Sequence, residues 1–201
     1  TNPVVSHSVT VKSVTAPVVQ SFMVTDSTGA TNAGKQGESL TFTVKLSEPV
    51  AVVGTPSLGV AIGSGTTAAL TASFSGGNNT DTLTFTGTAP AGDGALKLVS
   101  IGLGGSTITG NLSGQPIVAS GLSQAAAGYL VDNTAPSIST QSLSVPEGVR
   151  SVGQIAAATD ATPVSYSLGS GGNTGLFEVT SAGALSLKVA KDFEAEVAPR
   201  E

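Results

Sequence analysis

The chain has no cysteine and no tryptophan, and only one histidine among its 201 residues. The absence of cysteine excludes a disulfide framework, a cysteine-ligated zinc site and a thiol nucleophile. Charged residues make up 10% of the chain, and 13 acidic residues outnumber eight basic ones, for a net charge of −5. Because such a chain offers no phosphate-neutralising patch, we expect no nucleic-acid partner. No apolar run reaches the roughly 18 residues that span a bilayer, so we expect no membrane insertion.

Catalytic groups are also scarce. His7 has no neighbouring carboxylate or nucleophile, so a Ser-His-Asp triad would need distant residues to meet. Asp192 and Glu194 are two residues apart in an extended stretch, so both side chains point to one side, which suits a metal clamp better than an acid/base pair. The glycine-rich stretches 63–65 and 102–105 precede no helical pattern that could complete a phosphate site. We therefore predict that the protein is not an enzyme.

Small hydroxyl side chains and a two-residue periodicity dominate what is present. Threonine and serine number 25 and 26, a quarter of the chain, and turn sequences rich in Gly, Asn and Asp separate short apolar runs. Apolar and polar residues alternate in 39–46, 80–86, 164–168 and 185–187, which is typical of antiparallel sheets packed face to face. Only 123–127 has a spacing that suits a short turn of helix. The pattern predicts an all-β chain of tandem antiparallel β-sandwiches, with a core that includes Leu40, Phe42, Val44, Leu83, Phe85, Leu96 and Leu98.

A repeated linker sequence divides the chain. Val-Thr-Ala-Pro at 14–17 recurs as Asn-Thr-Ala-Pro at 133–136, and each copy precedes an extended stretch, 18–25 and 137–145. Proline stiffens a short connector, so we interpret both copies as links between modules. Residues 1–16 are then the last strand of a preceding module with its linker. Residues 17–136 form a complete sandwich with its linker, and 137–201 form an incomplete one.

The incomplete module has 65 residues, which is short of the roughly 100 of a β-sandwich. We expect its missing strands to leave an unpaired sheet edge. Because exposed edges pair with other chains, we expect a second polypeptide to complete this sheet.

Two family resemblances follow from longer stretches of sequence. Residues 37–44, 46–50, 55–58, 82–85 and 129–136 together resemble the bacterial immunoglobulin-like repeats of giant secreted adhesins, and they cover most of the middle module. The last module resembles a bacterial cadherin-like domain in 145–148, 157–160, 166–168, 177–185 and 192–194. The resemblance implies an Ig-like sandwich followed by a cadherin-like one.

The cadherin-like resemblance implies calcium at the module junctions. The family's carboxylates at the base of the domain match Glu147, Asp192 and Glu194 here, and calcium favours such hard oxygen ligands. If these three side chains share an ion, we expect their oxygens to lie within about 8 Å of one another.

The same resemblance implies an upper calcium site. Asp160 matches the first aspartate of the family's Asp-x-Asp, but Thr162 stands where the second aspartate belongs. The family's linker of several Asp and Asn is represented by Asp132 and Asn133. These departures weaken the match at the upper site relative to the lower one.

Two further patterns have an ordinary and a functional interpretation. The stretch 76–84 resembles one copy of the nine-residue calcium-binding toxin repeat, or is a Gly-Gly-Asn-Asn turn that leads into a strand. Thr80, Thr82, Thr84 and Thr86 form a row on one strand face, with shorter rows at 41–43 and 107–109. Such a row can order water for ice binding, or it is a solvated sandwich face.

These observations predict a structural stalk or adhesion module of a large secreted or bacterial cell-surface protein. Its expected partners are neighbouring modules, a second chain at the incomplete sheet, and a polysaccharide or cell-surface ligand. The alternative is a calcium-dependent polysaccharide-binding module. That function favours exposed aromatics, whereas Tyr129 and Tyr166 suit strand cores. A third interpretation is the accessory spacer of a secreted hydrolase.

Overall fold

The structure, a computed structural model, describes residues 14–29 and 32–192. These residues divide into two compact units at the peptide between Asn133 and Thr134, and each unit is described by itself. His7, Glu194 and most of the strand predicted in 1–16 lie outside the described residues. Across the described part of the chain, no helix is long and apolar enough to cross a membrane.

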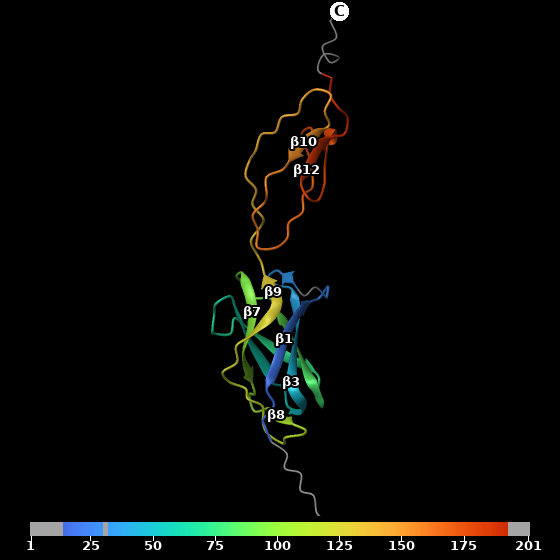
Figure 1. The fold of residues 1–201 in the computed structure, drawn as a ribbon. Coiled ribbons are helices and arrows are strands. Elements are labelled where there is room, and N and C mark those ends of the chain that lie inside the picture. The colour runs from blue at the N-terminus through green and yellow to red at the C-terminus, as the bar shows by residue number, and fades with distance from the viewer. Residues whose placement is uncertain (1–13, 30–31, 193–201) are drawn as a thin grey trace, which may run out of the picture. The chain divides into compact units, whose positions relative to one another are not determined.

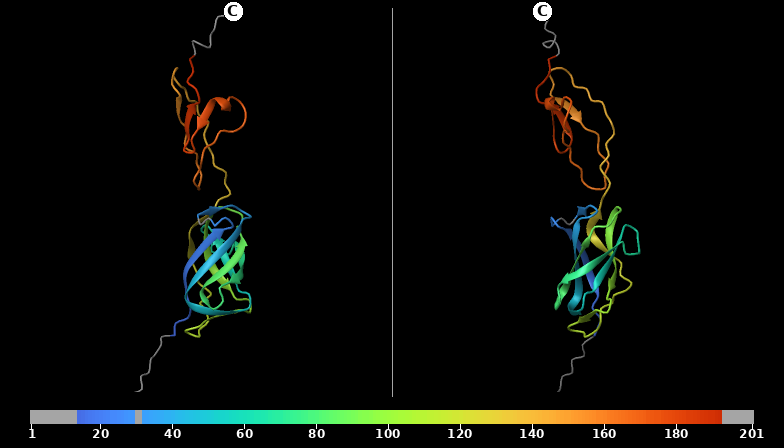
Figure 2. Two further views of the ribbon diagram at one scale, coloured as in Figure 1. Left: turned by 90° about the vertical axis from the view of Figure 1, so that its right-hand side faces the viewer. Right: turned by 180° about the vertical axis from the view of Figure 1, so that it is seen from behind.

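Nine strands build the described part of the first unit (Figure 1). They are β1 (Val19–Asp26), β2 (Ala33–Gly34), β3 (Ser39–Val53), β4 (Ser57–Ile62), β5 (Leu70–Gly76), β6 (Thr80–Thr88), β7 (Gly94–Gly102), β8 (Thr107–Gly110) and β9 (Gln124–Val131). They form one continuous sheet in the order β1-β3-β6-β5-β4-β7-β9-β2, and β8 pairs with the far end of β3. The sheet curls over so that β1 packs against β9, which closes a β-sandwich (Figure 2). The all-β prediction is confirmed.

The core of the first unit follows the predicted alternation. All seven core residues expected from the sequence are fully buried. In β3 the alternation continues for the whole 15-residue strand, because one face meets the core and the other meets solvent. Aromatic rings add two direct contacts, since Phe22 stacks on Phe42 at 5.9 Å and Phe74 meets Phe85 edge-on at 5.5 Å.

The turn between β5 and β6 is a hairpin turn. Asn79 adopts a left-handed backbone with φ of 63°, and Thr80 Oγ1 donates a hydrogen bond to the carbonyl oxygen of Gly77. Asn tolerates this conformation better than most residues. The hairpin interpretation of 76–84 therefore holds.

The short helix suggested by 123–127 is wrong. Residues 124–127 begin β9, which pairs antiparallel with β7. Pairing overrides the weak helical preference of the three alanines. Gly128, with φ of 74°, shifts the alternation by one residue, so that Ala126 and Tyr129 both face the core.

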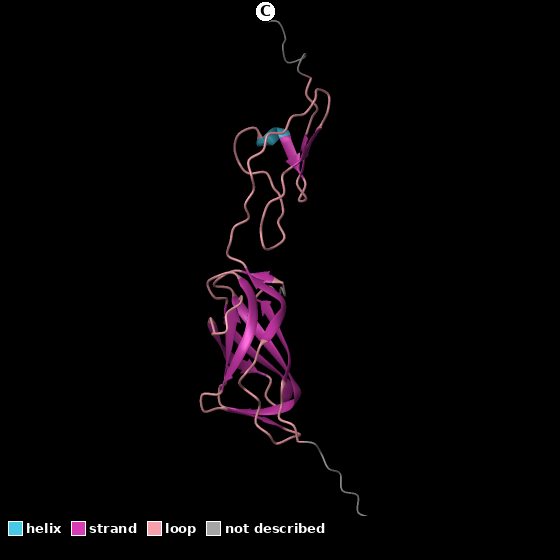
Figure 3. Cartoon of the chain, turned by 60° about the vertical axis from the view of Figure 1, so that its left-hand side comes forward, coloured by secondary structure: helices cyan, strands magenta, loops and turns pink. Residues whose placement is uncertain are grey.

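The second unit has little regular structure within 134–192. Its strands are β10 (Ser151–Gln154), β11 (Phe177–Val179) and β12 (Ala184–Leu187), in the order β10-β12-β11, with a short 3-10 turn at Thr174–Leu176. The predicted strands at 137–145 and 164–168 are loops (Figure 3), apart from an isolated bridge between Ser137 and Thr159. Alternation marks a stretch as suited to a strand, but a strand also needs a partner to pair with.

Candidate functional site

The two loops that carry the predicted lower calcium ligands lie side by side. Gly148 N donates a hydrogen bond of 3.0 Å to the carbonyl oxygen of Lys191, so the residues next to them, Glu147 and Asp192, stand on adjoining backbone. Both side chains are exposed. Gly148 has φ of 71°, and Val149 N closes this turn on the carbonyl oxygen of Pro146 at 3.2 Å.

This arrangement brings together the backbone of two residues that carry carboxylates. Among the residues that the structure describes, no group of three His, Cys, Asp or Glu side chains is placed to hold a metal. Calcium takes six to eight oxygen ligands, so two carboxylates alone make an incomplete site. The third predicted ligand, Glu194, is outside the described residues, and the shared ion stays a prediction.

The predicted upper ligands have local hydrogen-bonding roles. Asp160 accepts a 2.9 Å bond from Ala161 N, and its other carboxylate oxygen accepts a 3.1 Å bond from Thr162 Oγ1. Thr162 thus donates a hydrogen bond to Asp160 and supplies no second carboxylate at this position. Asp160 belongs to the second unit and Asp132 with Asn133 to the first.

Asn133 joins two loops where the chain leaves the first unit. Its Oδ1 accepts from Gln36 N at 2.6 Å, its Nδ2 donates to the carbonyl oxygen of Gly92 at 2.8 Å, and its backbone N donates to Asp93 Oδ1 at 2.6 Å. Asp132 N adds a bond of 2.9 Å to the carbonyl oxygen of Gly34. The sequence predicted a calcium ligand here, and these partners give Asn133 a structural role.

Hydrogen bonds also hold the chain where it enters the first unit. Val18 N donates to Ser47 Oγ at 3.1 Å, and Ser47 N donates back to the carbonyl oxygen of Val18 at 3.0 Å. Val118 N donates to the carbonyl oxygen of Pro17, which is itself buried. The proline-containing linker is therefore part of the folded unit.

These two attachments lie at opposite poles of the first unit. Gln124 Nε2, at the start of β9, reaches the carbonyl oxygen of Gln20, near the start of β1. The other end of β9 pairs with β2, which follows β1 in the chain, so β1 and β9 run in the same direction. The chain therefore enters the sandwich at one pole and leaves it at the other (Figure 1).

Glu48 is a buried carboxylate that the sequence did not single out. Its Oε2 accepts from Leu112 N at 2.8 Å and from Ser113 N at 3.0 Å, which holds the loop after β8 against β3. A hydrogen bond with the Ser113 side chain, together with these backbone donors, holds the pKa of Glu48 below its usual range. A Cβ at Gly110 would overlap Glu48 Oε1 and Ser113 Oγ, so the absence of a side chain at Gly110 makes room for both.

Tyr129 presents a buried hydroxyl near the pole where the chain leaves. Its side chain is 1% exposed, and its Oη has no hydrogen-bond partner among the described residues. Burial, and then the charges of Asp26 and Glu38, raise the pKa of Tyr129 to about 12. A Cβ at Gly34 would overlap both Tyr129 Oη and Glu38 Oε2, so the two oxygens face the same small space.

The strand register gathers the threonines of 41–43 and 82–86 into one face. Thr43 lies opposite Thr84 and Thr41 opposite Thr86 on the neighbouring strands β3 and β6. Thr25 on β1 and Ser73 on β5 extend the second of these rows on either side. We call this group, together with Thr82, the hydroxyl face; its members are Thr25, Thr41, Thr43, Ser73, Thr82, Thr84 and Thr86.

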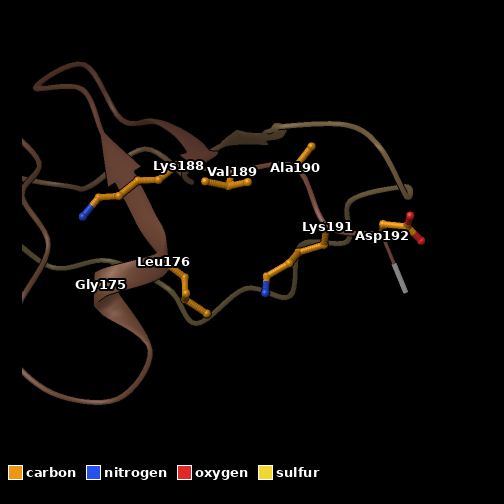
Figure 4. A pocket seen from close by; sticks show the side chains of 7 residues that line it. All are labelled: Gly175, Leu176, Lys188, Val189, Ala190, Lys191 and Asp192. Carbon is orange, nitrogen blue, oxygen red and sulfur yellow. The ribbon is translucent and has the colours of Figure 1, made fainter. Parts of the chain in front are cut away.

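A pocket of about 540 Å³ lies in the second unit (Figure 4). It opens between the end of the 3-10 turn and the segment that follows β12. Its lining is Gly175, Leu176, Lys188, Val189, Ala190, Lys191 and Asp192. Nothing in the sequence indicates this pocket, because its two sides come from separate segments that meet through the pairing of β11 with β12.

In comparisons with known proteins, no protein-family model, curated protein or solved structure matches the chain.

Proposed function

We propose that this chain is a spacer from the stalk of a secreted or surface-attached bacterial adhesion protein, and that it has no catalytic role. The observation that carries the proposal is the path of the chain through the first unit. The chain enters at one pole and leaves at the other, and hydrogen bonds hold it at both. A module of this kind adds its full length to a series, and it transmits tension along its strands.

The strand pairing suits such a load. A pull applied at Pro17 and Asn133 acts along β1 and β9. It must therefore shear the hydrogen bonds of β1 with β3 and of β9 with β7, rather than open them one at a time. The β1–β3 register extends over most of β1, from Val19 to Asp26. Bonds that break together resist more force than bonds that break in sequence.

Single-molecule stretching tests this function. Pulled from its two ends, the first unit should unfold in one discrete step. Asn133→Ala removes the side chain that joins the loops at 36 and 92, so it should lower the unfolding force. Asn111→Ala is the matched control, because Asn111 is exposed at the other pole. Gradual extension without a discrete step, or equal forces for the wild type and Asn133→Ala, would contradict the spacer role.

We further propose that calcium stiffens the intact protein at the base of the second unit. The adjoining loops of Glu147 and Asp192 support this, and Glu194 would be the third carboxylate. A ligand that binds only the folded state stabilises it by about 2.7 kcal/mol at a hundredfold excess over its dissociation constant. Calcium should therefore raise the melting midpoint of the second unit, and Glu147→Gln should abolish the effect while Glu178→Gln preserves it. Identical melting in calcium and in EDTA would remove calcium from this proposal.

The hydroxyl face supports a second candidate function, the binding of a polysaccharide. Neighbouring threonines on β3 and β6 present a regular array of donors and acceptors that could match sugar hydroxyls. A glycan array probed with and without calcium tests it. Thr43→Val with Thr84→Val should abolish any signal that arises from this face.

A further inference from the structure

The second unit exposes much of its apolar surface. Leu187 is its one buried hydrophobic residue within 134–192, whereas the first unit buries more than twenty. The large apolar side chains that it leaves exposed are Ile138, Leu143, Val149, Leu168, Leu176 and Val189. Small domains depend on burying such surface, so this unit as it stands lacks most of the burial that stabilises a sandwich.

Two of these residues form the walls of the pocket. Leu176 is 45% exposed and Val189 is 71% exposed, and they line opposite sides of it (Figure 4). A hydrogen bond of 2.9 Å from Lys188 N to the carbonyl oxygen of Leu176 closes one end. The bond from Gly148 N to the carbonyl oxygen of Lys191 fixes the segment beyond Val189. Backbone hydrogen bonds therefore fix the segment that forms one side of the pocket at both Lys188 and Lys191.

The residues that line the pocket have a positive net charge, whereas the net charge of the whole chain is negative. Lys188 and Lys191 both line it, against the single carboxylate of Asp192. The chain as a whole has only eight basic residues and a net charge of −5. The ammonium groups of Lys188 and Lys191 beside apolar walls favour a ligand that carries both apolar and acidic groups.

Backbone pairing is also open next to the pocket. β11 begins directly after Leu176 and is an edge of the three-stranded sheet, where it pairs with β12 alone among the described strands. An edge strand accepts an extended peptide through main-chain hydrogen bonds, while pockets beside it select the side chains.

We propose that this pocket is the docking site for an extended segment of another polypeptide in which apolar and acidic residues alternate. An apolar side chain of the segment lies between Leu176 and Val189, its neighbouring carboxylates pair with Lys188 and Lys191, and its backbone adds to β11. This inference concerns the second unit and is independent of the spacer role of the first.

A peptide titration tests the proposal. A suitable probe is a synthetic peptide with the sequence of residues 192–198, Asp-Phe-Glu-Ala-Glu-Val-Ala, which has the required alternation. Added to the full isotope-labelled chain, it should give saturable NMR shifts at the amides of Leu176, Lys188 and Val189. If the free second unit is not ordered in solution, the peptide should instead order it, which the dispersion of its amide signals reports. An absence of both effects would overturn the proposal.

Charge reversal and an apolar control make the test specific. Lys188→Glu with Lys191→Glu should weaken binding by about tenfold, and a peptide with lysine in place of glutamate should restore it. Replacing phenylalanine by serine in the probe should abolish saturation. Equal binding of that serine peptide, or shifts confined to the first unit, would show a general electrostatic attraction and contradict the docking site.

Discussion

At the scale of single residues, Glu48 gives the first unit a defined pH dependence. Its pKa in the folded state is lowered, chiefly by the Ser113 side chain and the backbone donors of the loop. The carboxylate therefore stabilises the fold above its unfolded pKa of about 4.3, and this stabilisation is lost as the pH falls through the lower folded value. Glu48→Gln should destabilise the first unit at neutral pH.

Denaturant unfolding as a function of pH measures this effect. The difference in unfolding free energy between the wild type and Glu48→Gln should narrow as the pH falls below about 4. Glu178→Gln, on an exposed side chain of the second unit, is the control and should leave the transition of the first unit unchanged. If the difference in unfolding free energy between the two proteins stayed constant from pH 7 to pH 3, the charge of Glu48 would not contribute to stability.

The raised pKa of Tyr129 predicts that the first unit loses stability at alkaline pH. Because burial and two carboxylates raise its pKa from 10 to about 12, the neutral phenol stabilises the fold below pH 10, and that stabilisation is lost as the pH rises through 12. Tyr129→Phe should be less sensitive to alkali.

At neutral pH the same substitution should be close to neutral or stabilise the fold by up to about 1 kcal/mol, because it removes a buried hydroxyl that has no partner. Absorbance titration of the phenolate, with unfolding curves from pH 8 to 12, checks both expectations. A loss of several kcal/mol on Tyr129→Phe would instead reveal a hydrogen bond to this hydroxyl.

The residues that the sequence could and could not reveal differ in one respect. Leu40, Phe42 and Leu83 were predictable because their burial follows from local alternation. The roles of Glu48 and Asn133 were not, because their partners lie 64 and 97 residues away in the chain. A polar side chain in a loop gives no local sign of the distant backbone groups that it will contact.

At the scale of elements, the contact of β2 with β9 depends on a glycine. Any side chain at Gly34 would overlap Tyr129 Oη and Glu38 Oε2. Gly34→Ala should therefore cost about 1–3 kcal/mol of unfolding free energy, as overpacking does elsewhere. In the Tyr129→Phe background one of the two overlaps disappears, so the cost should be smaller.

Chemical denaturation of the four proteins in this double-mutant cycle gives the coupling between positions 34 and 129. Additive effects would show that the glycine is needed for another reason. Gly169→Ala is a useful reference, because a Cβ at that position meets no atom within 4 Å.

Elements were predictable where pairing and periodicity agreed. β3 and β6 have clear alternation and pair with one another, and both were expected. The loop at 164–168 has the same alternation without a strand to pair with, and β9 lacks a regular alternation because Gly128 interrupts it. Periodicity reports which face a residue would present, whereas pairing decides whether a strand forms.

At the scale of the whole molecule, the two units should differ in cooperativity. The first unit contains the buried cluster that spans β1 to β9, and the second contributes only Leu187 to the buried apolar residues of the described chain. Hydrophobic burial supplies most of the free energy and heat capacity of unfolding. The second unit should therefore contribute little to a calorimetric transition.

Calorimetry and hydrogen exchange test this difference together. The main transition should have a heat-capacity change near 1.4–1.8 kcal/mol/K, which corresponds to roughly 120 residues, rather than the roughly 2.4–3.0 kcal/mol/K of 201 cooperative residues. Amides of β3, β6 and β7 should exchange slowly, and those of β10 to β12 should exchange orders of magnitude faster, because local opening is easiest where few apolar contacts are lost. A docked segment that covers Leu176 and Val189 should slow exchange in β11 and β12 alone. Equal protection of both units without any added polypeptide would mean that the second unit is stable by itself, and the case for a completing partner would fail.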